Sequence, residues 1–203
     1  MTVGPQNLEL IQAVLIGIGL SAACGFRVFV PLLGVSIAAH AGMLQLSPEF
    51  AWLGGTPALV ALILATLLEI AAYSVPYIDH LMDAVTTPAA VIAGTLLMAS
   101  LLGETQPFLK WSLALIAGGG TAGVVQTGSV LLRGGSTLLT GGSGNLLVAI
   151  FEFIAAAVLT VLTLMLPLLA AAVLMIIFLM LMRRLFRCVT GSDPNPKGDF
   201  PTE

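Results

Sequence analysis

The longest apolar stretch of the chain limits its fold more than any other feature. Residues 145–187 contain one acidic residue, Glu152, and no basic residue before the last five positions. A membrane-spanning helix needs about 20 mostly apolar residues. As one helix this stretch would be about 65 Å long, roughly twice the thickness of the hydrocarbon core. Because proline suits the first turn of a helix and disrupts its interior, we expect two spans, 145–164 and 167–187, divided at Pro167.

The composition indicates that lipid is the solvent of this chain. Of its 203 residues, 58% are hydrophobic and 8% are charged, whereas soluble domains carry about 25% charged residues. Seven Lys and Arg against ten Asp and Glu offer no basic surface for nucleic acid. The two cysteines define no disulfide framework, and the spacings typical of zinc sites, P-loops, hydrolases and metalloproteases are missing from the sequence. We therefore expect an integral membrane protein that is not an enzyme, uses no cofactor and binds no nucleic acid.

Four further apolar stretches complete the predicted spans. Residues 57–76 and 87–103 are continuous, whereas 8–41 and 108–133 are interrupted by small residues at 21–25 and 118–123. Glycine weakens a helix by about 1 kcal/mol relative to alanine. In lipid, an unwound backbone survives only where protein or water covers it. The sequence therefore predicts an all-α polytopic membrane protein of about six spans, two of which contain glycine breaks and either cross or re-enter the membrane.

Basic residues predict the orientation in the membrane. Arg183, Arg184 and Arg187 flank the last span, and basic residues concentrate on the cytoplasmic side. With six crossings both termini lie in the cytoplasm, and we expect the inner membrane of a bacterium. Residues 1–190 are expected to form a single transmembrane domain, followed by a disordered, proline-rich cytoplasmic tail at 191–203.

The two halves of the chain, 8–103 and 107–187, share an order of parts. Each has a glycine-broken segment followed by an arginine, Arg27 or Arg133. Each then has a span with one glutamate, followed by a proline and a third apolar span. Three crossings per half would orient the halves oppositely, as in the inverted repeats of secondary transporters. The alternative is that sequence rich in Ala, Leu and Gly produces this likeness by chance.

Charged residues within the apolar stretches are the main candidates for a functional site. An ionisable group near the centre of a membrane helix costs at least about 2.5–3.5 kcal/mol. Glu69 and Glu152 lie in spans, and Arg27 and Arg133 follow the breaks, which suggests one arginine for each glutamate. With Gln126 they would line a site for an ion or a small anion, and the glutamates would carry protons. The alternative is that the charges neutralise each other and only hold the helices together.

A second candidate site follows the span 57–76. Asp79 and Asp83 are four residues apart, which places them on one helix face, and His80 lies close to both. Such a trio suits a divalent cation or a proton relay. The plainer interpretation, which we favour for His80, is a turn at the membrane interface, with Asp79 as a helix cap and Asp83 in solvent.

Three strings of the sequence resemble a known family. They are GLSAACGFRVFVPLL at 19–33, the segment 69–90 that ends in DAVTTPAA, and the glycine-rich segment 118–145. They resemble the bacterial and plant membrane family known as domain of unknown function 4126, over about residues 8–187. The resemblance implies a polytopic integral membrane protein, and it carries over no catalytic residue.

These patterns favour a small transporter or channel-like protein that moves a small anionic or zwitterionic solute, with proton coupling through the glutamates. Arginines and the N-termini of broken helices favour anionic groups. Helix faces rich in Gly and Ala allow close packing, and we expect a homo-oligomer. Two alternatives stay open, a membrane scaffold or assembly subunit that transports nothing, and a protein that binds a lipid headgroup at the breaks. Access of water to the breaks distinguishes a transporter from a scaffold.

Overall fold

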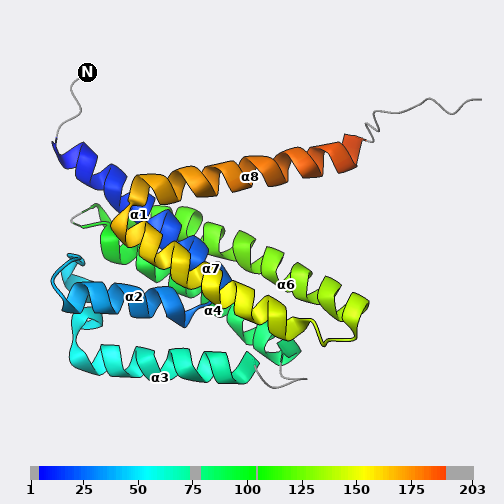
Figure 1. Cartoon of the computed structure of the whole chain (residues 1–203). Coiled ribbons are helices and arrows are strands. Elements are labelled where there is room, and N and C mark those ends of the chain that lie inside the picture. The colour runs from blue at the N-terminus through cyan, green and yellow to red at the C-terminus, as the bar shows by residue number, and fades with distance from the viewer. Residues whose placement is uncertain (1–4, 74–78, 104, 191–203) are drawn as a thin grey trace, which may run out of the picture. The chain divides into compact units, whose positions relative to one another are not determined.

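Helices make up nearly all of residues 5–73, 79–103 and 105–190, which are the part of the chain that the computed structural model describes (Figure 1). In chain order the elements are α1 (Pro5–Phe26), α2 (Phe29–His40), the 3-10 helix η1 (Pro48–Gly54), α3 (Thr56–Tyr73), α4 (Asp79–Leu101), α5 (Pro107–Leu113), the π-helix η2 (Ala114–Gly119), α6 (Gly120–Thr140), α7 (Asn145–Met165) and α8 (Pro167–Thr190). Within these described ranges, five helical segments are long and apolar enough to cross a membrane, or six if η1 and α3, bent by 64°, form one span. The chain is therefore an all-helical protein suited to insertion in a membrane.

The predicted division of the longest apolar stretch is confirmed. α7 ends at Met165 and α8 begins at Pro167, and Leu166 between them has the non-helical angles φ −138° and ψ 68°. The chain divides into two compact units, Met1–Ala171 and Ala172–Glu203. The first, called unit 1 below, contains α1 to α7, and the second contains most of α8.

The span predicted at 87–103 is longer than expected. α4 begins at Asp79 and takes Pro88 into its interior. A proline removes one N–H from the helix and its ring crowds the carbonyl oxygen of the preceding turn, so it weakens the helix at that point. Next to it, the Thr87 hydroxyl donates to the Asp83 carbonyl oxygen at 2.7 Å. Pro88 does not mark the start of α4, because α4 packs against other helices both before and after this residue.

α1 and α2 form an antiparallel pair rather than one kinked rod. A methyl group added at Gly19 of α1 would strike Thr163 of α7, and one added at Gly34 of α2 would strike Thr160, one turn away. Arg27 lies between these two glycines in the sequence. It donates to the Ala149 carbonyl oxygen, which lies about 16 Å from Thr160 toward the start of α7. Residues 8–41 therefore run into the bundle and back. The break expected at 21–25 is wrong, because these residues are helical and the chain turns at Arg27 and Val28, the tip of the pair.

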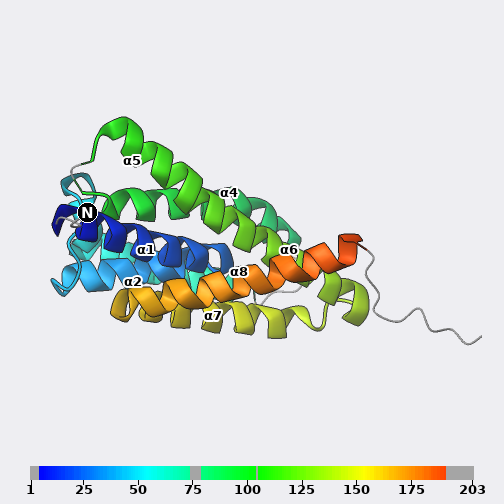
Figure 2. The same ribbon diagram turned by 90° about the horizontal axis from the view of Figure 1, so that it is seen from above.

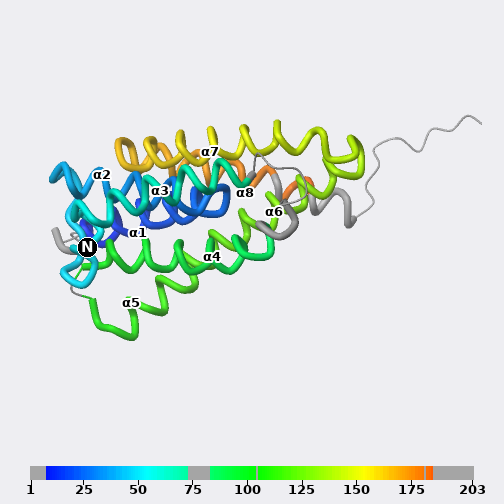
Figure 3. The backbone as a smooth tube through the Cα atoms, turned by 90° about the horizontal axis from the view of Figure 1, so that it is seen from below, coloured from blue at the N-terminus to red at the C-terminus, as the bar shows by residue number. Residues whose placement is uncertain are grey.

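The expected break at 118–123 is wrong, because these residues are helical. Residues 107–140 form one 34-residue helical segment of α5, η2 and α6, which continues past Arg133 and passes along α4 (Figure 3). An added methyl group at Gly118 would lie 2.5 Å from the Gly94 carbonyl oxygen of α4. These glycines therefore let two helix backbones approach closely, and the close packing compensates for their weak helix propensity.

The first pieces of the two halves, α1 and α6, run in the same direction, whereas the glutamate-bearing α3 and α7 run in opposite directions (Figure 1). Gly17 of α1 and Gly118 of η2 both lie against Met98 of α4, and farther along the pair Gly25 lies against Ala122 of α6. α1 and α6 therefore point the same way through unit 1. An inverted repeat would set α1 and α6 in opposite directions as well, so the structure gives no support to that arrangement.

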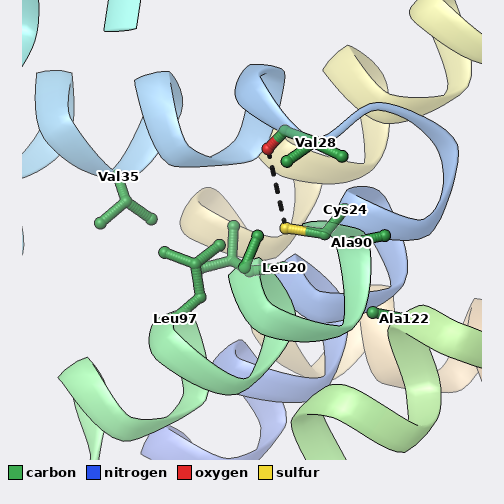
Figure 4. Packing of buried hydrophobic residues seen from close by; sticks show 8 residues of the cluster. Leu20, Cys24, Val28, Val35, Ala90, Leu97 and Ala122 are labelled. Carbon is green, nitrogen blue, oxygen red and sulfur yellow. Dashed lines mark hydrogen bonds between the residues drawn. The ribbon is translucent and has the colours of Figure 1, made fainter. Parts of the chain in front are cut away.

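Small apolar side chains fill the interior around the tip of the α1–α2 pair. Leu20 and Cys24 of α1 pack with Leu97 of α4 and Ala122 of α6, and all four are fully buried (Figure 4). The Cys24 thiol lies 3.9 Å from the Val28 carbonyl oxygen, which it approaches as a donor. Val28, the residue after Arg27, belongs to the same cluster, so this packing brings the tip against α4.

Candidate functional site

Most of the buried charged side chains of unit 1 lie near the end at which α3 and α6 finish and α4 and α7 begin (Figure 1). We call this the network end. Arg27 comes from the tip of the α1–α2 pair, and Arg133 and Glu152 come from the middle thirds of α6 and α7. Their side chains are 2%, 3% and 1% exposed. The residues that the structure brings together here form the arginine network, defined as Arg27, Asp83, Ser129, Arg133 and Glu152.

Arg133 holds the centre of the network. Its Nε donates to Glu152 Oε1 at 3.1 Å, and its Nη2 pairs with Glu152 Oε2, which makes a two-point contact between α6 and α7. Its Nη1 pairs with Asp83 of α4. The Ser129 hydroxyl, one turn before Arg133, donates to Glu152 Oε1. Two-point pairs of arginine and carboxylate are the strongest and most directional of ion pairs.

Arg27 approaches the same glutamate from the other side. Its Nη2 donates to the Ala149 carbonyl oxygen at 2.9 Å and lies 3.6 Å from Glu152 Oε2. Glu152 therefore faces both arginines, which differs from the expected arrangement of one arginine for each glutamate. With Asp83 included, the network has two positive and two negative groups, so it is formally neutral when all four are ionised.

Glu69 binds backbone instead of heading an ion pair of its own. Its Oε1 accepts from the Val28 N–H at 2.9 Å and its Oε2 from the Phe29 N–H at 3.2 Å. Helices begin with N–H groups that have no partner inside the helix, and a nearby carboxylate satisfies both their hydrogen bonds and their partial positive charge. Val28, the N-cap residue of α2, has no acceptor in its own side chain, so Glu69 of α3 supplies the cap.

The remaining predicted site residues have separate places. Gln126 lies on the same α6 face as Ser129 and Arg133, and its amide donates to the Thr86 hydroxyl of α4 at 3.2 Å. Of the trio proposed as a cation or proton relay, only the Asp83 side chain is described, and it belongs to the arginine network. The side chains of Asp79 and His80 lie outside the described part.

Sequence reasoning missed Ser129. Gln126, Ser129 and Arg133 are spaced three and four residues apart, the spacing of one helix face. That signal was available, but it applies only if the segment is helical, and the glycines around it predicted a break. For the same reason the pairing of Asp83 with Arg133 was not predicted, because Arg133 was expected at the end of a broken segment and not inside α6.

The arrangement suits the binding of a small anion. Guanidinium groups bind carboxylates and phosphates through parallel hydrogen bonds, and here two of them are held together in a site with little access to water. In this structure the carboxylates of Glu152 and Asp83 already form ion pairs with the arginines. A soluble anion would have to replace one of these carboxylates.

Comparison with known proteins gives one match. Residues 14–187 match the family described as Domain of unknown function (DUF4126). No curated protein and no solved structure matches the chain significantly.

Proposed function

We propose that this chain, which belongs to the domain of unknown function (DUF4126) family, is a small membrane transporter whose solute site is the arginine network. The observation that carries the proposal is the convergence of Arg27 and Arg133 on Glu152 inside a bundle of apolar helices. Charged groups at such depth are costly and usually serve an ion or substrate pathway. Two guanidinium groups favour a small anionic or zwitterionic solute.

Asp83 is the group that an entering anion would replace. Its side chain is 12% exposed, against 3% for Arg133 and 1% for Glu152, so it forms the accessible edge of the network. A proton on Asp83 removes its negative charge and weakens its pairing with Arg133. The arginine can then pair with the solute, and movement of the anion becomes linked to movement of a proton.

The tip of the α1–α2 pair is the part that would move. It is held by the side chains of Arg27 and Glu69, through hydrogen bonds to Ala149 and to the first N–H groups of α2. No continuous helix passes through the tip, so these bonds can exchange without unwinding α1 or α2. Release of the tip would open a path from the network toward the opposite end of unit 1.

The same pair supports a revised orientation. α2 has 12 residues and is about 18 Å long, too short to cross a hydrocarbon core of about 30 Å. We place α1 and α2 as a segment that enters and returns, followed by five crossings. Arg183, Arg184 and Arg187 keep the C-terminus in the cytoplasm of a bacterium, and the N-terminus then lies outside. Reporter fusions at each terminus test this orientation.

Transport is tested with purified protein in sealed liposomes that contain a pH-sensitive dye. Acetate, phosphate and glycine serve as probes for a monocarboxylate, an oxyanion and a zwitterion. We expect one of them to move protons faster than in protein-free liposomes, and Arg133→Gln to abolish the difference. Arg183→Gln removes an exposed arginine outside the network and is the matched control.

A membrane scaffold is the second candidate. The observation that favours it is the close packing of Gly94 of α4 against Gly118 of η2 and Ala122 of α6, which suits a rigid body. A scaffold keeps the tip dry, so Cys24 would resist a membrane-impermeant maleimide from both sides under every condition. That result, together with no response to any of the three probes, would favour the scaffold over the transporter.

A further inference from the structure

A pocket of mixed polar and apolar lining lies where α5 begins. This is the end of unit 1 opposite the network end, and Figure 2 shows the start of α5 there. Its volume is about 240 Å³, and its lining includes Glu49, Thr105, Lys110 and Trp111. Sites for drug-sized ligands are larger, at roughly 300–1,000 Å³. The pocket therefore suits a compact group that carries charge.

Lys110 is the buried cation of this pocket. Its side chain is 5% exposed, and its Nζ donates to Glu49 Oε2 at 2.5 Å and to Ser47 Oγ at 3.4 Å. The Nζ also lies 5.7 Å from the centre of the Phe50 ring. An ammonium group has three N–H donors, so these two hydrogen bonds leave one for another acceptor. Glu49 is 67% exposed and is free to turn toward a cation on a ligand.

The pocket lies at the start of a helical segment that is long and apolar enough to cross a membrane, and lipid headgroups are expected at such a position. Lys110 is the fourth residue of the apolar segment 107–140, about 5 Å from its start. Phe108, Trp111 and Trp52 of the neighbouring η1 are exposed near it. Tryptophans concentrate where a membrane helix meets the headgroup region. A group bound beside Lys110 would therefore come from the interface.

We propose that this pocket binds the phosphoethanolamine headgroup of a phospholipid, with the phosphate on Lys110 and the ammonium on Glu49. A cation and an anion side by side complement a phosphate and an ammonium joined by a short linker. A primary ammonium can donate to the Glu49 carboxylate, whereas a trimethylammonium cannot. The same ammonium suits the face of Trp111. A headgroup without a cation would meet the Glu49 carboxylate and be disfavoured. This site does not depend on the arginine network.

Native mass spectrometry of the detergent-purified full chain tests the proposal. The probes are dihexanoyl phosphatidylethanolamine, phosphatidylcholine and phosphatidylglycerol, and free phosphoethanolamine as a competitor. We expect a one-to-one adduct with phosphatidylethanolamine that is at least ten-fold more abundant than the others. Lys110→Gln should remove it, Lys110→Arg should retain it, and Lys197→Gln, the same change in the C-terminal tail, should leave it unaltered.

Glu49→Gln tests the other half of the site. Because Glu49 is exposed, this variant is expected to remain monodisperse on size exclusion, and it should lose the preference for phosphatidylethanolamine over phosphatidylglycerol. Displacement of the lipid by free phosphoethanolamine would support the headgroup chemistry and indicate that a soluble phosphoethanolamine can also occupy the pocket. Equal adducts with all three lipids, or an undiminished adduct in a folded Lys110→Gln variant, would overturn the proposal.

Discussion

Arg133 and Glu152 form a two-point ion pair across the junction of α6 and α7, with Arg133 Nε donating to Glu152 Oε1 at 3.1 Å. The two helices are joined by four residues, 141–144, and each residue lies about two turns from that junction. The pair therefore fixes the register of the two helices. Because Arg27 and Asp83 also join it, the same contact connects the α1–α2 tip and α4 to this helix hairpin.

Loss of the Glu152 charge should destabilise the protein more than any other neutral replacement of a carboxylate. Glu152→Gln leaves Arg27 and Arg133 buried with one carboxylate fewer. Removing one partner of a buried ion pair costs about 3–5 kcal/mol of unfolding free energy. Unfolding in mixed detergent micelles measures this value. Glu9→Gln, which alters an exposed residue of α1, is the control and should change stability by less than about 0.5 kcal/mol.

Double-mutant cycles should separate direct from indirect contacts in the network. We expect a coupling energy of about 1–3 kcal/mol between Arg133→Gln and Glu152→Gln, because the two side chains share two hydrogen bonds. The cycle of Arg27→Gln with Glu69→Gln should give less than about 0.5 kcal/mol, since Glu69 binds the backbone of α2. A larger coupling in the second cycle would mean that Glu69 pairs with Arg27.

Release of the helix cap should expose Cys24. Its side chain is fully buried beside the tip, so with Cys188→Ser an impermeant maleimide should label it slowly. Glu69→Gln replaces an acceptor of two N–H groups by one carbonyl oxygen, and a lost cap costs about 0.5–2 kcal/mol. We expect labelling of Cys24 to become several-fold faster in this variant. An unchanged rate, with a permeant maleimide reacting normally, would show that the tip does not move with its cap.

Two glycines of the same helical segment should respond oppositely to alanine. Gly118→Ala would place a methyl group 2.5 Å from the Gly94 carbonyl oxygen and 2.7 Å from Met98 Cβ, so it should destabilise by about 1–3 kcal/mol. Gly128→Ala meets nothing within 4 Å and should stabilise by about 0.5–1 kcal/mol through helix propensity. Thermal unfolding of the two variants measures both effects. Equal shifts in the two would argue against close contact of η2 with α4.

The Thr163 hydroxyl is a source of instability that can be removed. It is fully buried in α7, and its oxygen has no hydrogen-bond partner within the described part of the chain. Thr163→Val keeps the shape and removes the unsatisfied group, so it should stabilise by about 1 kcal/mol. Thr160→Val is the matched control, because the Thr160 hydroxyl donates to the Ala156 carbonyl oxygen at 2.7 Å. The unfolding free energy of this control variant should be unchanged or lower in the same assay.

The sequence was sufficient for the features that depend on local chemistry. Long apolar runs determined that the chain is all-helical and suited to lipid, and Pro167 determined where α7 and α8 divide, because proline disfavours the interior of a helix. The charges in those runs also identified Arg27, Arg133 and Glu152 as neighbours of interest, since isolated charges are costly in lipid.

Tertiary structure decided the features that depend on what packs against each segment. Gly118 and Gly119 have weak helix propensity, yet they stay helical because close contact with α4 compensates for it. The direction of α2 and the choice of partner for Glu69 depend on which helix ends come together in space. Propensity acts over a few residues, whereas a cap supplied by α3 to α2, or two arginines that share Glu152, joins positions 19 to 125 residues apart.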